Sequence, residues 1–287
     1  MSTLFTHKLS LLAVLLLFVM NLQGQDPPTR LLIRIDDMGF SHAANIACIE
    51  TYQKGVAKSV EVIVPGPWFE EAASLLQENP GLDAGVHLVL TSEWANLKWR
   101  PLTPAPSLVD EDGYFFPMLW ENKRFPPDQY LLASDWKIEE VEAEWRAQIE
   151  LAQKKIPQLT HLSGHMGCSN ISEAARALLR SLAAEYGLDI HLEDAGVKRV
   201  PSWSGSKYSA KQKEKRFIQM LAELGPGDWL LVEHPGYATG ELETVGHIGY
   251  ENVGVDRDGV TKVLTSKKVK KALQKKGIQL ISYTDLK

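Results

Sequence analysis

The chain has 287 residues, 44% of them hydrophobic, and a formal net charge of −5. This length and apolar content suit one large α/β domain, and the negative charge argues against non-specific nucleic-acid binding. The two cysteines, Cys48 and Cys168, are expected to be free thiols, because Cys48 lies on the expected buried face of a helix and a large domain needs no disulfide.

The N-terminus has the pattern of a targeting signal. Lys8 precedes a wholly apolar run at residues 11–20, and Gly24 offers a small residue for cleavage. This pattern predicts a signal peptide over residues 1–24 and one domain over residues 26–287, in a protein that is secreted or periplasmic. An uncleaved anchor is the alternative. No later apolar run is long enough to cross a bilayer, so no membrane span is expected in the mature chain.

The mature chain begins with a short apolar run at residues 31–33, which is typical of a buried strand and leads to the adjacent carboxylates Asp36 and Asp37. Ser41 can cap a helix that extends to Tyr52. The next expected elements are a strand at 59–64, a helix at 68–77 and a strand at 83–90.

Residues 92–135 interrupt this alternation. They hold many prolines and few regular patterns, as a functional loop or lid does. Their aromatic side chains are candidates for sugar-stacking platforms or for a hydrophobic cluster that pins the loop to the barrel, and both interpretations stay open. These side chains are Trp94, Trp99, Tyr114, Phe115, Phe116 and Trp120.

The second half returns to alternating elements, which supports a parallel sheet with helical crossovers. No glycine-rich phosphate fingerprint follows the first strand, so a dinucleotide-binding sheet is disfavoured. We therefore expect an irregular (β/α) TIM-type barrel of about seven parallel strands with a long aromatic loop insertion. The expected elements are helices at 138–152, 172–186, 209–224 and 267–276, and strands at 159–165, 188–192, 229–236 and 278–283.

Unusual polar residues fall at four of the expected strand ends, which converge on one face of a barrel. One Asp with two His suits a divalent metal with open positions. Two adjacent Asp repel one another, and one simple arrangement makes one a ligand and the other a general base. An Asx-turn and hydrogen-bonded core histidines are the alternatives. The residues are Asp36, Asp37, His87, His161, His165 and His234.

Four ordered motifs resemble the signatures of the YdjC-like carbohydrate deacetylases, also called the ChbG/HpnK family. The resemblance covers about residues 31–285, and its C-terminal part includes the stretch around Arg257. The motifs are Ile35-Asp36-Asp37-Met38-Gly39, Gly85-Val86-His87-Leu88-Val89-Leu90-Thr91, Thr160-His161-Leu162-Ser163-Gly164-His165 and Glu233-His234-Pro235-Gly236.

The resemblance implies an irregular TIM-type barrel and metal-dependent removal of acetyl groups from amino sugars or oligosaccharides. By position, Asp37, His87 and His165 match the ligands of one divalent ion, for which Zn or Mg is expected, with His161 as the alternative third ligand. Met38 stands where many members carry Phe, and relatives are often richer in Asp and His after residue 162, so the resemblance leaves the substrate open.

Asp36 matches the family's base, and we expect His234 to be the acid. The metal would activate a water molecule, Asp36 would take its proton, and His234 would protonate the leaving amine. Two alternatives are a non-catalytic carbohydrate-binding protein on a deacetylase scaffold and a metal-dependent esterase or amidase for another acyl group. A retaining glycosidase is disfavoured, because the two carboxylates are adjacent in sequence. The sequence does not predict an oligomeric state.

Overall fold

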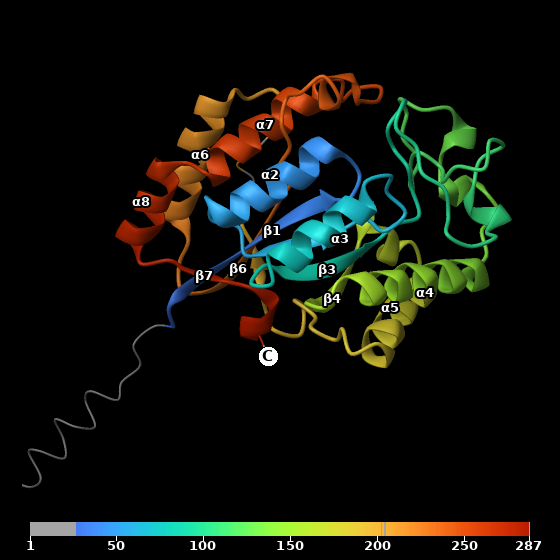
Figure 1. The fold of residues 1–287 in the computed structure, drawn as a ribbon, viewed down its shortest axis with the longest axis horizontal. Coiled ribbons are helices and arrows are strands. Elements are labelled where there is room, and N and C mark those ends of the chain that lie inside the picture. Colours follow the sequence, from blue (N-terminus) through green and yellow to red (C-terminus); the bar gives the residue numbers. More distant parts are fainter. Residues whose placement is uncertain (1–26, 202, 204, 287) are drawn as a thin grey trace, which may run out of the picture.

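The computed structural model describes residues 27–201, 203 and 205–286, so the expected signal peptide lies outside the described residues. Its centre is a curved sheet in which every strand pair is parallel (Figure 1). The strand order is β4-β3-β2-β1-β6-β5, and β7 also pairs with β1. The strands are β1 (Thr29–Met38), β2 (Ser59–Val62), β3 (Asp83–Leu88), β4 (Leu159–Gly164), β5 (Lys198–Arg199), β6 (Gly227–Glu233) and β7 (Gln279–Ile281).

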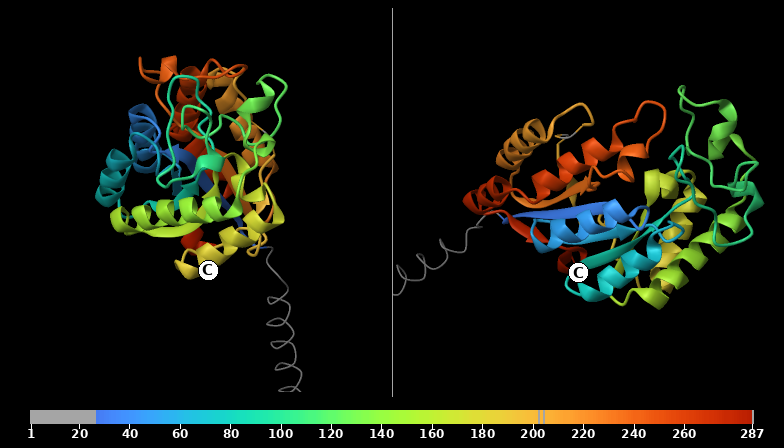
Figure 2. Two further views of the ribbon diagram at one scale, coloured as in Figure 1. Left: turned by 90° about the vertical axis from the view of Figure 1, so that its right-hand side faces the viewer. Right: turned by 45° about the horizontal axis from the view of Figure 1, so that its top comes forward.

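Helices lie outside the curved sheet (Figure 2). Several begin where the sequence predicts. The Ser41 hydroxyl accepts a hydrogen bond from the Ala44 amide, and Ser209 forms a capping box with Gln212. The helices are α2 (His42–Gln53), α3 (Phe69–Glu78), α4 (Ile138–Lys155), α5 (Glu173–Glu185), α6 (Ala210–Glu223), α7 (Val253–Leu264) and α8 (Lys267–Lys276). Among the described residues, none of the helices is long and apolar enough to cross a membrane.

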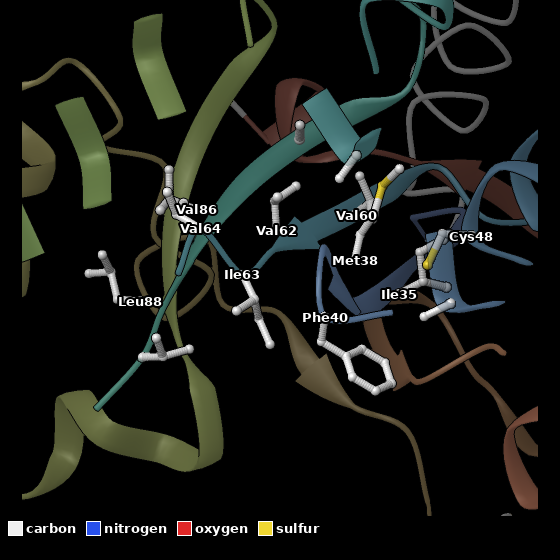
Figure 3. Packing of buried hydrophobic residues seen from close by; sticks show 14 of the residues in the cluster. Ile35, Met38, Phe40, Cys48, Val60, Val62, Ile63, Val64, Val86 and Leu88 are labelled. Atoms are coloured by element: carbon white, nitrogen blue, oxygen red, sulfur yellow. The ribbon is translucent and has the colours of Figure 1, made fainter. Parts of the chain in front are cut away.

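The core lies between the central strands and the helices that cover them. Cys48 and Cys168 are both buried there as free thiols. A buried thiol loses hydration when it ionises, so burial raises the pKa of both groups and keeps them protonated. Figure 3 shows residues from β1, β2, β3 and α2 in this core, among them Ile35, Met38, Val60, Val62, Val86, Leu88 and Cys48.

The sheet is an open, barrel-like curve rather than a closed barrel. Within the part of the chain that the structure describes, no ladder joins β4 to β5. The strand predicted at 188–192 is wrong, because only Asp189 pairs there, in an isolated antiparallel bridge to His161. Ile190 is buried without pairing, at 7% exposure. Apolar alternation indicates burial of one face, whereas pairing requires a neighbouring strand in register.

Helix α7 is the main element that the sequence pattern did not predict. Gly254 and Gly259 lie within it and lower its helix propensity. Gly259 allows close contact with α6, since a Cβ atom there would lie 3.1 Å from the Lys213 Cδ. Packing against α6 and α2 therefore stabilises α7 despite its weak local signal.

The irregular segment after β3 carries only three short 3₁₀ turns, η1 (Pro106–Leu108), η2 (Pro127–Gln129) and η3 (Leu131–Ala133), before α4 begins. Figure 1 shows it beyond the end of the sheet to which β1 points. Trp94, Trp99 and Phe115 are buried at 2%, 3% and 0% exposure. Burial of these rings favours the packing interpretation for them, while Trp120, at 46% exposure, stays available to a ligand.

Candidate active site

The site begins at the end of β1, where the backbone turns sharply. Asp37 has a φ of 71°, a left-handed conformation that is uncommon for a residue other than glycine. Gly39 follows with a φ of 102°, and a Cβ atom there would lie 2.5 Å from the Ile63 carbonyl oxygen. Such conformations cluster at functional sites, because surrounding structure must hold them in place. The turn directs the Asp37 carboxylate toward histidines from two neighbouring segments.

Asp37, His87 and His165 form one compact group. Each offers one ligand atom, and these atoms lie within 4.8 Å of one another. Asp37 Oδ1 is 3.3 Å from His165 Nδ1 and 3.7 Å from His87 Nε2. This oxygen is buried, and within the described part of the chain it has no well-aligned hydrogen bond. A buried, unpaired carboxylate oxygen facing two imidazole nitrogens fits a divalent cation, which prefers this donor set.

A hydrogen-bonded chain fixes the orientation of the His87 ring. Ser163 donates its hydroxyl proton to Glu61 Oε2 at 2.5 Å, and its oxygen lies 2.6 Å from His87 Nδ1. Because Ser163 uses its only proton on Glu61, His87 Nδ1 must be the donor, which leaves Nε2 free to bind a cation. Burial lowers the pKa of His87 to about 4, so the ring is neutral.

His165 lies between two carboxylates. Its Nε2 is 3.1 Å from Glu93 Oε2, while its Nδ1 faces Asp37. Burial by itself would lower the pKa of His165, but the charges and hydrogen bonds of Glu93 and Asp37 together outweigh it, and the pKa rises to about 10. Without a cation, His165 is therefore protonated and bridges Asp37 and Glu93. A cation bound at Nδ1 would displace that proton, while Nε2–H would still donate to Glu93.

Arg257 balances the negative charge of Asp37 at its second carboxylate oxygen, Oδ2. Its Nη2 donates to Asp37 Oδ2 at 2.7 Å, and its guanidinium lies 4.7 Å from the centre of the Phe40 ring. Burial alone would raise the pKa of Asp37, but Arg257, together with His234 and His165, holds it well below its usual range. Arg257 is only 3% exposed, and its Nε and Nη1 have no hydrogen-bond partner among the residues that the structure describes. It supplies a fixed positive charge beside the carboxylate.

The expected base and acid lie on two sides of this group. Asp36 accepts two hydrogen bonds from Arg34, each at 2.8 Å, and its Oδ2 is 3.7 Å from His87 Nε2. His234 Nε2 is 3.9 Å from Asp37 Oδ2. Desolvation lowers the pKa of His234, although its side chain is 42% exposed. Both side chains are therefore within reach of a substrate held beside Asp37.

His161 does not join the group, although it is on the same strand as Ser163. It is fully buried, with Nε2 2.6 Å from Glu61 Oε1 and Nδ1 2.7 Å from the Thr160 hydroxyl. Its ring also stacks on Tyr283, with ring centres 3.3 Å apart. Both nitrogens are engaged below the site, so His161 supports Glu61 and has no nitrogen directed toward Asp37.

Sequence reasoning did not identify three residues of the site, Arg34, Glu93 and Arg257, as candidates, and it noted Arg257 only through the family resemblance. Arg34 precedes Asp36 by two positions, so strand periodicity places both on one face and could have revealed the pair. Glu93 follows the end of β3 and could have been found as another polar residue beyond a strand end. Arg257 is 220 residues from Asp37 and has no local signal that indicates their contact.

Comparison with known proteins gives one consistent family. Residues 30–275 match the family model described as YdjC-like protein. A carbohydrate deacetylase of Thermus thermophilus is 36% identical over 234 residues, covering 74% of this chain and 79% of the relative. A carbohydrate deacetylase of Listeria monocytogenes is 27% identical over 264 residues, covering 90% of this chain and 100% of the relative.

The fold also has a solved counterpart. A crystal structure from Enterococcus faecalis V583, named as a candidate cellobiose-phosphate cleavage protein, matches with a TM-score of 0.69 and 24% identity. The match covers 90% of this chain and 99% of that chain, so the two share their architecture along nearly the whole chain.

Proposed function

The chain belongs to the YdjC-like protein family, and from this membership and the site geometry we propose that it is a metal-dependent carbohydrate deacetylase. The substrate would be an N-acetylated amino sugar or oligosaccharide. The observation that carries the proposal is the buried, unpaired Oδ1 of Asp37, which faces ring nitrogens of His87 and His165.

Asp37, His87 and His165 would hold one divalent cation, Zn or Mg. When bound, the cation would polarise the acetamide carbonyl and increase the acidity of a water molecule. His87 is suited to this role because Ser163 and Glu61 leave its Nε2 unprotonated. Two imidazole donors favour Zn over Mg, which prefers oxygen ligands.

Asp36 would accept the proton of the attacking water. Arg34 holds both of its oxygens, which fixes the orientation of the carboxylate next to His87. His234, partly exposed on the other side of Asp37, would serve the leaving nitrogen. Because its lowered pKa leaves the ring neutral, His234 must first receive a proton before it passes one to the amine. Each group would contribute about 10²–10⁴-fold to kcat.

We also propose that the protein acts outside the cytoplasm, after removal of residues 1–24. The apolar run behind Lys8 and the small residue Gly24 support this location. An acetylated oligosaccharide at the cell surface or in the periplasm would then be the substrate.

The test uses the mature chain, residues 26–287, with acetate release from N-acetylglucosamine oligomers and metal content as readouts. His87→Ala should lose both the metal and the activity, while His42→Ala, a partly exposed histidine on α2, should keep both. Equal metal and equal activity in the two variants would contradict the proposal. Sugar binding without acetate release would favour the binding-protein alternative, and hydrolysis of acetyl esters alone would favour an esterase.

A further inference from the structure

A cavity of about 230 Å³ opens where the sheet is not closed, between β4 and β5. One wall comes from β1 and β4, and the other from α5, the segment after it and β5. We call it the seam cavity and define it by Arg34, Ser163, Arg176, Arg180, Glu193 and Arg199, which all line it.

The lining is predominantly cationic. The lining contains four arginines and one acidic residue, Glu193. Arg180 is compensated by Glu193 at 3.2 Å and by Asp194 at 3.0 Å. Among the described residues, no carboxylate lies within ion-pair distance of Arg176 or Arg199. Two guanidinium groups in the lining are therefore uncompensated, and they favour a negatively charged ligand.

The inner wall of the seam cavity is formed by groups that hold the candidate active site. Arg34 binds Asp36 through two hydrogen bonds of 2.8 Å. Ser163 lies 2.6 Å from Nδ1 of His87. The seam cavity is thus separated by one side chain from the proposed base and from a proposed metal ligand. A ligand there would contact residues that orient the site without occupying the place of the sugar.

We propose that the seam cavity binds a small carboxylate, and that its occupant is the acetate which the proposed deacetylation releases. This inference rests on the proposed function for the source of the acetate. The volume favours a small ligand, since drug-sized ligands occupy pockets of roughly 300–1,000 Å³. The planar fork of a guanidinium matches the two oxygens of a carboxylate. Inorganic phosphate shares this chemistry and serves as the competing ligand in the test.

The experiment measures binding of radiolabelled acetate to the metal-loaded mature chain by equilibrium dialysis. Arg176→Gln/Arg199→Gln should weaken acetate binding by at least about tenfold, because the variant loses two charged hydrogen-bond donors to the carboxylate. The matched control is Arg146→Gln, which removes an arginine from α4, away from the seam cavity. Acetate should lower kcat of the wild type without raising KM for the sugar, and this inhibition should weaken in the double variant.

Unchanged acetate affinity in the folded double variant would overturn the proposal, because the acetate would then bind elsewhere, as at the metal. Loss of phosphate binding alone would overturn the assignment of acetate. If the double variant does not fold, Arg199→Gln alone provides the same comparison at an exposed position. Failure of the proposed function is distinguishable, since dialysis needs no turnover. If the wild type shows no deacetylase activity but binds acetate, and the double variant does not bind it, then the seam cavity is still the acetate site and only the proposed function fails.

Discussion

Replacing Arg257 with methionine should change stability by an amount that depends on the metal. The substitution keeps a long apolar side chain beside Phe40 and Trp94 but removes the 2.7 Å hydrogen bond to Asp37. Asp37 is 2% exposed, and the Arg257 charge is the largest of the contributions that, with those of His234 and His165, hold its pKa low against burial. Arg257→Met therefore leaves a buried carboxylate without its closest cation.

Removal of one partner from a buried ion pair costs about 3–5 kcal/mol. This value applies to the metal-free protein. A divalent cation held by Asp37, His87 and His165 would return positive charge to the carboxylate, so the cost should fall when the site is filled. If the metal reduces the cost of the substitution, then Arg257→Met must bind the metal more tightly than the wild type does. The affinity should increase about tenfold for each 1.4 kcal/mol by which the metal reduces that cost.

The assay is urea unfolding of wild type and Arg257→Met, once with a chelator and once with saturating Zn²⁺. Arg146→Met is the matched control, because that arginine pairs with Glu142 and Glu185 at the surface. A surface pair contributes about 0–1 kcal/mol, so the control should lose little and be indifferent to metal. The same destabilisation of Arg257→Met with and without Zn²⁺ would refute the view that metal and arginine neutralise one carboxylate.

Three further changes test other parts of the structure. Ser163→Ala should weaken metal affinity about 10–100-fold, measured by competition with a chromophoric chelator, because His87 loses the partner that fixes its tautomer. Trp120→Ala should raise KM for oligosaccharides and leave the unfolding midpoint unchanged, because this ring is exposed. Trp99→Ala removes a buried ring and should cost about 3–5 kcal/mol of stability. Unchanged kinetics in Trp120→Ala would exclude a sugar contact. Burial raises the pKa of Glu233 to about 8, so the folded state retains its proton longer than the unfolded state, and the Glu233 contribution to stability should fall as pH rises from about 4.5 to 8. Glu233→Gln removes this contribution, so stability of the variant relative to the wild type should increase with pH across this range in unfolding curves, and a difference that does not change with pH would contradict it.

Local sequence patterns located most of the regular elements. Serine caps and apolar spacing placed α2, α6 and α8, because these signals act within one or two helical turns. Polar residues at strand ends also singled out Asp37, His87 and His165, which the structure brings within 4.8 Å. Parallel topology explains why this worked, since it carries successive strand ends to the same edge of the sheet.

Tertiary packing decided the rest. The sequence could not distinguish His161 from His165, because the difference lies in their neighbours, Glu61 and Tyr283 for one and Asp37 and Glu93 for the other. Nor could it show that the sheet stays open between β4 and β5, since pairing depends on register with a distant strand.

The sequence by itself determined the alternation of strands and helices and the candidate metal ligands at the strand ends, because both depend on residues close together in the chain. Only the tertiary structure determined how charge is balanced in the site. Arg257 reaches Asp37 across 220 positions, from a helix whose glycines lower its local propensity and which packing against α6 supports. The free energy of such a contact depends on burial of both partners, and no local pattern in the sequence specifies that burial.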